Sequence, residues 1–301
     1  MALPASELAA MFANRVAKNA RHLGKWAKRE AVTCWRVYDR DIPELPVTLD
    51  TYDGALVLND YRIDPSDDAW LDALGAAAKE ALSASEMFVK RRERLTERQE
   101  GHQYERIAQT NAFRVVKELG RSFRVNLGDY VDTGLFLDHR ITRARVAAEP
   151  AKSLLNLFAY TGSFSVHAAA AGMQTTSVDL SNTYTEWARM NLDLNQLDGE
   201  VIAMDVRAFL VQARRERRRW DVAIVDPPTF SNSKKMSYTW DIQRDNAALL
   251  ADVKEVADIV WFSTNRKRFK LEYDAGTISD ETHATTPPDF RGTPHRAWRL
   301  S

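Results

Sequence analysis

Apolar side chains recur at about one helical turn along the first 31 residues, and basic side chains occupy many of the positions between them. The apolar positions are Leu8, Met11, Phe12, Val16, Leu23 and Trp26. This spacing is typical of an amphipathic helix with one face against a core. It predicts a helix over residues 6–29, within a basic amphipathic N-terminal segment of residues 1–31.

The pattern then changes to short alternating runs, which indicate strands. The expected elements are a strand over residues 32–39, a hairpin over 47–62, a helix over 66–82, and strand-like runs near residues 86 and 113 on either side of a polar linker. The dipeptide Asp53-Gly54 favours a tight turn in the hairpin. Together these elements predict a small α+β accessory domain over residues 32–125.

From residue 126 onward, short apolar runs alternate with segments of helical periodicity. The expected strands are residues 153–160, 175–181, 201–205, 221–228 and 258–265. Such alternation is typical of a doubly wound parallel sheet with helices on both faces. Two C-terminal runs, TISDET and HRAWRLS, can add two strands as a hairpin. The sequence therefore predicts a Rossmann-like α/β domain with a mostly parallel, seven-stranded sheet over residues 126–301.

The amino-acid composition argues against several classes of protein and site. The 301 residues are 45% hydrophobic and 28% charged with no net charge, which fits a soluble globular protein. No apolar run approaches the roughly 18 residues of a membrane span, so we expect no membrane contact. The single cysteine, Cys34, rules out an internal disulfide and favours a reducing, cytoplasmic location. The six histidines show no metal-ligand spacing such as HxxxH, so we expect no metal site.

The turn after the first strand of this domain, NLFAYTGSFS (residues 156–165), contains one glycine, Gly162. A dinucleotide site needs GxGxxG so that the backbone can approach a pyrophosphate, and neither this motif nor a P-loop is present. Three strands end in an acid, at Asp179, Asp205 and Asp226. Each acid could instead cap the next helix. Together with the glycine turn, however, they favour a cofactor that has an adenosine and no phosphates, S-adenosylmethionine. We expect Asp179 to bind its ribose, Asp205 its adenine, and Asp226 to lie where cofactor and substrate meet.

Four segments carry a resemblance to a known family. They are DTGLFLDHR (residues 132–140), LNLFAYTG (155–162), VDLS (178–181) and DPPTFSNSK (226–234). In these segments the chain resembles class I S-adenosylmethionine-dependent methyltransferases. Within that class it is similar to the guanine-N7 methyltransferase half, or K module, of the bifunctional bacterial 23S ribosomal RNA methyltransferases K/L. The resemblance covers nearly the whole chain, but the half with the RNA-binding THUMP module has no counterpart.

The resemblance implies a cytoplasmic enzyme that methylates 23S ribosomal RNA or a large-subunit precursor, with an RNA-binding accessory domain and a separate partner protein for RNA targeting. It also implies the cofactor site. Besides the three acids, the expected residues are Phe136, Asp138, Arg140, Asn156, Phe158, Tyr160, Thr161, Gly162, Leu180, Ser181 and Val206. Arg140 is the candidate partner of the methionine carboxylate, and His139 is expected to be structural rather than catalytic.

The fourth strand runs into DPPTFSNSKK (residues 226–235), where two prolines end the strand and stiffen the backbone. The expected catalytic residues are Asp226, Pro227, Pro228 and Phe230. The aromatic ring would stack on a target base that has left its helix. Basic residues are expected to neutralise RNA phosphates, namely Lys234, Lys235, Arg266, Lys267 and Arg268.

Several acceptors compete. Guanine N7 already presents a lone pair, so no proton must leave before transfer. Methylation of the exocyclic N2 atom stays open, because (D/N)PP-aromatic motifs serve that reaction too. Cytosine C5 methylation needs a cysteine nucleophile, and we reject it because Cys34 lies far in sequence from the DPPTF segment. The glycine turn and the strand-end acids argue against a non-catalytic ribosome-assembly factor, and the missing GxGxxG argues against an NAD-dependent oxidoreductase.

Overall fold

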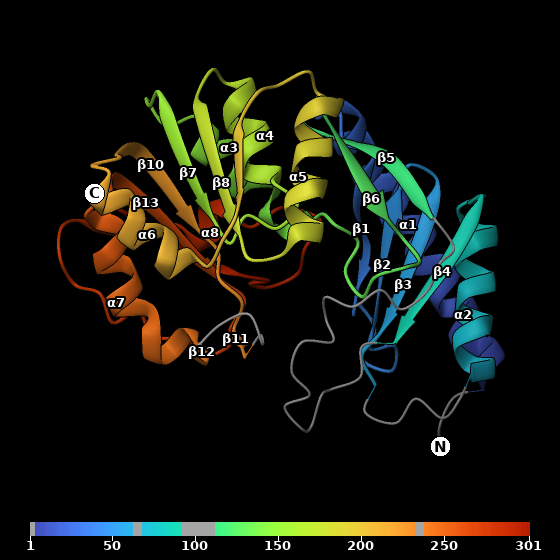
Figure 1. Ribbon diagram of the computed structural model, residues 1–301. Coiled ribbons are helices and arrows are strands. Elements are labelled where there is room, and N and C mark those ends of the chain that lie inside the picture. The colour runs from blue at the N-terminus through green and yellow to red at the C-terminus, as the bar shows by residue number, and fades with distance from the viewer. Residues whose placement is uncertain (1–3, 63–67, 92–111, 233–237) are drawn as a thin grey trace. The chain divides into compact units, whose positions relative to one another are not determined.

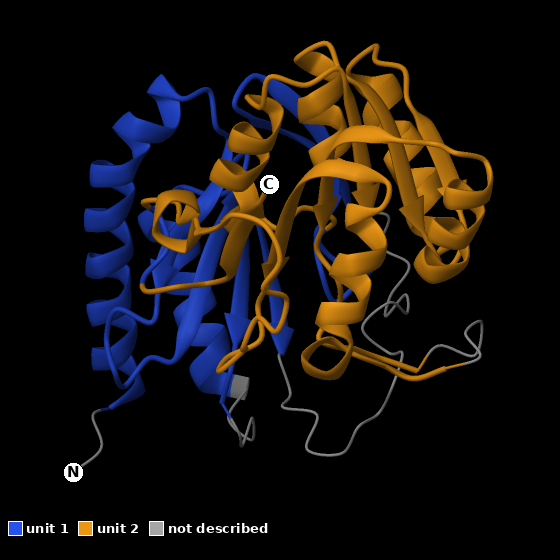
Figure 2. Cartoon of the chain, turned by 90° about the vertical axis from the view of Figure 1, so that its left-hand side faces the viewer, with its two compact units in different colours: residues 1–133, 289–291 blue, residues 134–288, 292–301 orange. Residues whose placement is uncertain are grey.

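In the computed structural model, the apolar stripe of the N-terminal segment forms one face of helix α1 (Ala5–Arg29). The structure describes residues 4–62, 68–91, 112–232 and 238–301. The chain divides into two units, residues 1–133 with 289–291 and residues 134–288 with 292–301 (Figure 2).

The first unit packs α1 against a four-stranded sheet. The strands, in spatial order, are β1 (Cys34–Asp39), β2 (Val47–Tyr52), β3 (Ala55–Asp60) and β4 (Glu86–Arg91). Leu8, Phe12 and Val16 of α1 are buried in the core of this unit. The ring of Phe12 lies edge-on to that of Tyr38, with centroids 4.8 Å apart. The apolar stripe of the sequence is therefore the packed face of the helix.

The connections in this unit follow the expected turn chemistry. Asp53 and Gly54 join β2 to β3 with φ angles of 50° and 86°, the positive values that a type I′ hairpin turn requires. Helix α2 (Asp68–Ala81) joins β3 to the parallel strand β4. A separate hairpin consists of β5 (Phe113–Glu118) and β6 (Arg121–Asn126). The division into a helical segment of residues 1–31 and a domain of residues 32–125 stays a prediction.

The second unit contains the predicted seven-stranded sheet (Figure 1). Its spatial order is β14 (Ile278–Asp280), β15 (Arg296–Leu300), β13 (Ala257–Thr264), β10 (Trp220–Val225), β7 (Ser153–Leu157), β8 (Gln174–Asp179) and β9 (Glu200–Ala203). Only β15 runs antiparallel to its neighbours. The predicted fold class is thereby confirmed. The two C-terminal strands pair as expected, although helix α8 (Thr282–Thr285) interrupts the segment between them.

Helices cover both faces of this sheet. On one face, helices α3 (Arg140–Ala147) and α4 (Ser163–Ala170) pack against the strands, and α5 (Asn182–Leu194) lies beside α4. On the other face lie α6 (Val206–Arg215) and α7 (Ile242–Lys254). Strand β10 shows why both faces are apolar. Val222 and Ile224 point into the first layer, and Ala223 and Val225 point into the second.

The parallel strands β7, β8, β9, β10 and β13 all end on the same edge of the sheet, which we call the carboxyl edge. The start of the antiparallel strand β15 lies at this edge too, because Arg296 pairs with Thr264. None of the described helices combines the length and the hydropathy that a bilayer span requires.

Candidate functional site

The carboxyl edge brings the three strand-end acids of the sequence together. Asp179 is the last residue of β8, Asp226 directly follows β10, and Asp205 follows β9 by two residues. Each carboxylate is only partly buried. This is the edge at which open α/β sheets bind ligands.

Asp179 holds the turn that follows β7. Its Oδ2 accepts a hydrogen bond from the Tyr160 backbone N–H, and its Oδ1 accepts one from the Ser181 N–H, both at 2.9 Å. The turn itself is tight, because Phe158, Tyr160 and Gly162 all have positive φ angles. The Asp179 carboxylate thus holds two further expected cofactor residues, Tyr160 and Ser181, by their backbone.

Gly162 is required by a close approach between two helices. It precedes α4 with a φ of 75°, and a Cβ atom at this position would lie 2.8 Å from the Cβ atom of Ala188 in α5. The neighbouring Thr161 is fully buried, and its hydroxyl donates to the carbonyl of Gly134 at 2.6 Å. Thr161 and Gly162 therefore shape the turn from inside the fold.

Three other residues expected at the cofactor have buried side chains. Asn156, on β7, donates from its amide to the Ser165 hydroxyl at 3.0 Å, so its side chain links strand to helix. Arg140 opens α3 with no exposed surface, so a contact with a methionine carboxylate requires part of its guanidinium to become accessible. Val206 is buried in the first turn of α6 and can offer only its backbone.

Asp205 acts as the helix cap that the alternative interpretation expected. Its Oδ1 accepts from the Ala208 N–H at 3.0 Å at the start of α6. Its Oδ2 accepts from the Tyr238 hydroxyl at 2.8 Å, and burial together with this carboxylate raises the pKa of Tyr238. Both oxygens thus have partners in the fold before any ligand binds. An adenine contact would add to these bonds or displace one of them.

The residues after Asp226 form a braced loop. The Trp240 indole N–H donates to the carbonyl of Pro228 at 2.7 Å. Phe230 begins β11 (Phe230–Ser231), which pairs with β12 (Trp240–Asp241) as a short ribbon. The two prolines end the parallel strand as expected. The support from Trp240 was not predicted, since nothing local links residues 228 and 240.

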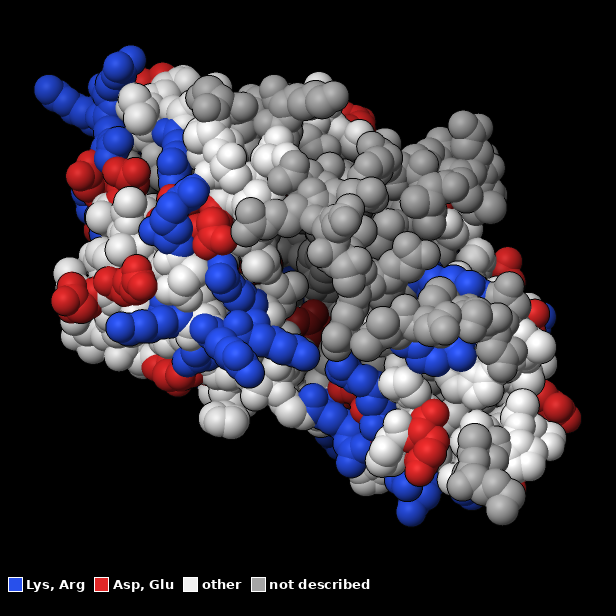
Figure 3. Space-filling model, turned by 90° about the horizontal axis from the view of Figure 1, so that it is seen from below, with Lys and Arg blue, Asp and Glu red and all other residues white. Residues whose placement is uncertain are grey.

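The basic residues divide into three groups. Arg266 forms an ion pair with Asp241 at 2.9 Å, whereas Lys267 and Arg268 are exposed after β13. Lys234 and Lys235 lie outside the described residues. Figure 3 shows lysine and arginine side chains gathered on the face seen from below, with acidic side chains among them.

An aromatic group lies beside the turn. The ring of Tyr160 is 5.1 Å from that of Phe136 and 4.5 Å from that of Tyr184. Phe136 is 40% exposed, so part of its side chain is accessible beside the turn. Tyr184 was not among the expected residues.

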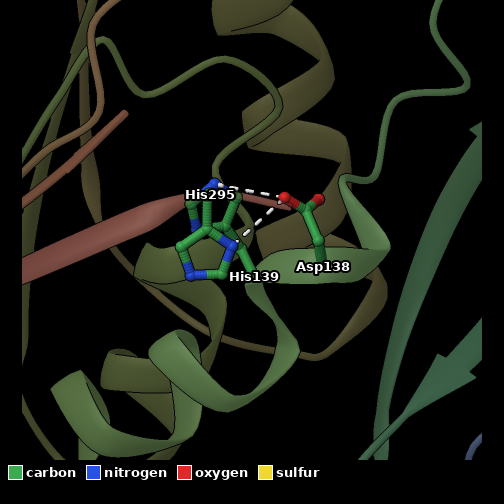
Figure 4. Close-up of side chains that lie close together, drawn as sticks. All are labelled: Asp138, His139 and His295. Carbon is green, nitrogen blue, oxygen red and sulfur yellow. Dashed lines mark hydrogen bonds and ion pairs between the residues drawn. The ribbon is translucent and has the colours of Figure 1, made fainter. Parts of the chain in front are cut away.

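A cluster of two histidines and two acids was also not predicted; Figure 4 shows three of its members, Asp138, His139 and His295. Nδ1 of His295, just before β15, lies 3.2 Å from Oδ2 of Asp138 in the 3₁₀ turn η2 (Leu137–His139). Nε2 of His139 lies 3.6 Å from Oδ2 of Asp226 and 3.9 Å from Oδ2 of Asp138. Ser263 of β13 donates to the other oxygen of Asp226 at 2.6 Å. Burial lowers the pKa of His139, and the nearby acids only partly oppose this effect.

The ligand atoms of Asp138, His139 and His295 lie within 4.8 Å of one another, a separation that a metal ion could bridge. The two imidazole rings, however, are stacked, with centroids 4.1 Å apart and an interplanar angle of 23°. A ring nitrogen binds a metal through a lone pair in the plane of its ring, so two nearly parallel rings do not direct their lone pairs at one point. The cluster suits hydrogen bonding better than metal coordination.

Known proteins resemble this chain over most of its length. Residues 40–256 match the family model described as S-adenosylmethionine-dependent methyltransferase. The chain is 44% identical to a Neisseria meningitidis protein named ribosomal RNA large subunit methyltransferase K, over 96% of this chain and 86% of that one. It is also 44% identical to a Stutzerimonas stutzeri protein named ribosomal RNA large subunit methyltransferase K/L, over 98% of this chain but only 42% of that one.

Solved structures show the same fold at lower identity. A candidate S-adenosylmethionine-dependent methyltransferase from Streptococcus mutans superposes with a TM-score of 0.80 at 22% identity, over 100% of this chain and 82% of that one. A methyltransferase from Agrobacterium tumefaciens superposes with a TM-score of 0.62 at 19% identity, over 85% and 87%.

Proposed function

The chain belongs to the family of S-adenosylmethionine-dependent methyltransferases, and we propose that it transfers the methyl group to guanine N7 of 23S ribosomal RNA. In this reaction the N7 lone pair attacks the methyl carbon, and the carbon–sulfur bond breaks. The bonding electrons go to sulfur, which leaves S-adenosylhomocysteine, and the positive charge moves to the base. No proton has to be removed, so the protein mainly has to align the two reactants.

The proposed cofactor site is the carboxyl edge between β7 and β9. Asp179 would receive the ribose hydroxyls, since its carboxylate is partly exposed and held in place by two backbone donors. Phe158, Tyr160 and Leu180 would pack against the adenosine, and Phe136 would cover it with its exposed ring. Asp138 and Asp226 would face the positive charges of the methionine part.

The observation that supports the proposed site for the methyl acceptor is the DPPTF loop, whose backbone is held by hydrogen bonds. Trp240 fixes the carbonyl of Pro228, and Ser263 fixes one oxygen of Asp226, so the loop presents a rigid edge. Phe230 lies four residues beyond Asp226 at the start of β11. We assign it to stacking on the extruded guanine, with the base edge bound by Asp226 and backbone carbonyls.

The RNA class is inferred from the relatives, whose names give large-subunit ribosomal RNA as substrate. The exposed residues Lys267 and Arg268 are the described candidates for phosphate contacts, and Lys234 and Lys235 remain candidates by sequence. The chain spans 42% of the length of the K/L relative, and RNA targeting by a separate partner protein stays part of the proposal.

One observation favours a second acceptor, the exocyclic N2 atom of guanine. Transfer to N2 leaves an extra proton on the amine, which the partly exposed carboxylate of Asp226 would accept. N7 transfer needs no such acceptor.

The test is methylation of ribosomal RNA from cells that lack this protein. The chain is incubated with isotope-labelled S-adenosylmethionine, the RNA is digested to nucleosides, and the products are compared by mass spectrometry with 7-methylguanosine and N2-methylguanosine standards. Labelled 7-methylguanosine supports the proposal, and N2-methylguanosine supports the second candidate. The reaction is repeated with an added extract of those cells, which supplies a targeting partner, and no labelled methylguanosine in either reaction refutes both.

Phe230→Ala and Phe230→Leu test the stacking role. Stacking is worth about 1–3 kcal/mol per base, so loss of the ring should lower single-turnover transfer roughly fivefold to 150-fold while S-adenosylmethionine affinity stays nearly constant. Leucine retains apolar bulk without a π face. If Phe230→Leu transfers as well as the wild type, or if both variants lose melting temperature and cofactor affinity together, Phe230 packs the loop and does not stack.

A further inference from the structure

Two of the acids proposed to face the cofactor share one buried histidine. Nε2 of His139 lies between Oδ2 of Asp226 at 3.6 Å and Oδ2 of Asp138 at 3.9 Å. The His139 side chain is 6% exposed, whereas those of Asp226 and Asp138 are 23% and 17% exposed. The histidine therefore lies behind two carboxylates that still reach the surface of the site.

The surroundings of the ring favour its uncharged form. Among the residues that the structure describes, Nδ1 of His139 has no hydrogen-bond partner, so a proton placed there would be buried without an acceptor. His295 stacks on one side of the ring, and Phe164 of α4 approaches it edge-on at 5.8 Å. Burial lowers the pKa of His139, as do the charges of His295 and of Arg143 in α3, while Asp226 and Asp138 raise it.

His295 is held more firmly than His139. Its Nδ1 contacts Asp138 at 3.2 Å, and its Nε2 lies 3.2 Å from the hydroxyls of both Thr142 and Thr285. His295 therefore acts as a fixed support, and His139 is the ring of the pair whose bonding can change.

S-adenosylmethionine carries two positive groups, the sulfonium and the α-ammonium. A protonated His139 would carry a third positive charge within reach of the same acids. We propose that a proton on His139 and the cationic groups of S-adenosylmethionine compete for the carboxylates of Asp226 and Asp138, so that cofactor binding expels this proton. His139 is then a positioning residue that keeps both acids available while it is uncharged. The inference rests on the proposed cofactor contacts of the two acids.

The sign of the effect follows from linkage. At pH values where His139 is protonated in the cofactor-free protein, cofactor binding releases up to one proton. Cofactor affinity then falls by at most about tenfold for each unit by which the pH falls. Where free His139 is already neutral, no proton is released and affinity is flat. Because burial lowers the pKa of His139, the change falls on the acid side of the ordinary histidine range.

The test is calorimetry of S-adenosylmethionine binding from about pH 7.5 to about pH 5 in buffers of different ionisation enthalpy, which counts the protons released. The wild type should release a growing fraction of a proton as the pH falls, with a roughly threefold to tenfold loss of affinity. His139→Gln keeps an amide donor near the position of Nε2 but cannot titrate, so its proton count should stay near zero. His167→Gln, which replaces another buried histidine outside the cluster, should behave as the wild type.

A second measurement follows the titration of His139 in the wild-type protein itself. In the wild type, the imidazole proton of His139, assigned by its absence in His139→Gln or His139→Asn, should titrate at a lower pH when S-adenosylmethionine is bound. Equal proton release by wild type and His139→Gln, or a His139 titration that the cofactor does not shift, overturns the inference. The RNA assay at about pH 7.5 is independent of this count. Absence of labelled 7-methylguanosine therefore refutes the proposed function without affecting the proton competition.

Discussion

Replacing Gly162 with alanine would place a methyl group in steric overlap with helix α5. The new Cβ atom would lie 2.8 Å from Cβ and 3.2 Å from Cα of Ala188. Neither neighbour is the end of a flexible side chain, so α4 or α5 must move by several tenths of an ångström. The residue must also keep a φ of 75°, a conformation that disfavours any L side chain.

The cost has two parts. Left-handed backbone costs alanine about 1–2 kcal/mol, and overpacking a close contact typically costs about 1–3 kcal/mol. Gly172→Ala is the matched control, because Gly172 lies just past the other end of α4 with a φ of 95° and no atom within 4 Å of its Cβ position. Gly172→Ala should therefore lose only the backbone contribution to stability, about 1–2 kcal/mol.

The measurements are melting temperature and cofactor affinity. Because each kcal/mol shifts the melting temperature by roughly 2–4 °C in a domain of this size, Gly162→Ala should melt at least about 2 °C below Gly172→Ala. Its S-adenosylmethionine affinity should fall as well, since the turn after β7 moves with α4. The double variant Gly162→Ala/Ala188→Gly should recover part of the loss. If Gly162→Ala proves as stable as Gly172→Ala, the close approach of α4 and α5 is wrong.

Three further predictions concern the edges of the site. Asp179→Asn should weaken S-adenosylmethionine binding by about 1–3 kcal/mol in calorimetry, because the amide offers one acceptor where the carboxylate offers two; unchanged affinity would remove Asp179 from the site. Trp240→Phe should cost about 0.5–1.5 kcal/mol in chemical denaturation through the lost bond to Pro228, and should slow RNA methylation more than it weakens cofactor binding; a normal transfer rate would show that the brace is dispensable. Cys34→Ser should retain RNA methylation, since Cys34 is buried in β1; loss of activity in a folded variant would reopen cytosine C5 chemistry.

The parts of the fold that depend on local sequence patterns could be predicted from the sequence. The alternation of apolar runs and amphipathic helices after residue 126 determines a doubly wound sheet, because right-handed crossovers leave few other topologies. The turn at Asp53-Gly54 could be predicted because few residues tolerate its positive φ angles.

The site could be predicted only as far as single strand ends. Asp179, Asp205 and Asp226 come together because parallel strands end on one edge. The sequence left the cofactor and capping interpretations of these acids open, and the structure shows a cap at Asp205 but none of this kind at Asp179. Which interpretation holds depends on the backbone N–H groups that the next loop presents.

Contacts between distant segments could not be predicted. Asp138 and His295 are 157 positions apart, and no periodicity relates them. His139 has no metal-ligand spacing in the sequence, yet its neighbours in space include the other three members of the cluster. The support of Asp226 by Ser263, 37 positions away, likewise exists only once β10 and β13 have paired.

The place of β15 in the sheet has a consequence for biosynthesis. Of the seven strands of this sheet it is translated last, yet it lies between β13 and β14 and supplies the ladder partner of both. Until residues 296–300 have left the ribosome, β14 lacks its strand partner and β13 keeps an open edge. Between the synthesis of β13 and that of β15, the nascent chain therefore carries an incomplete sheet with an unpaired edge, and a ribosome stalled near residue 290 would hold a species prone to wrong pairing.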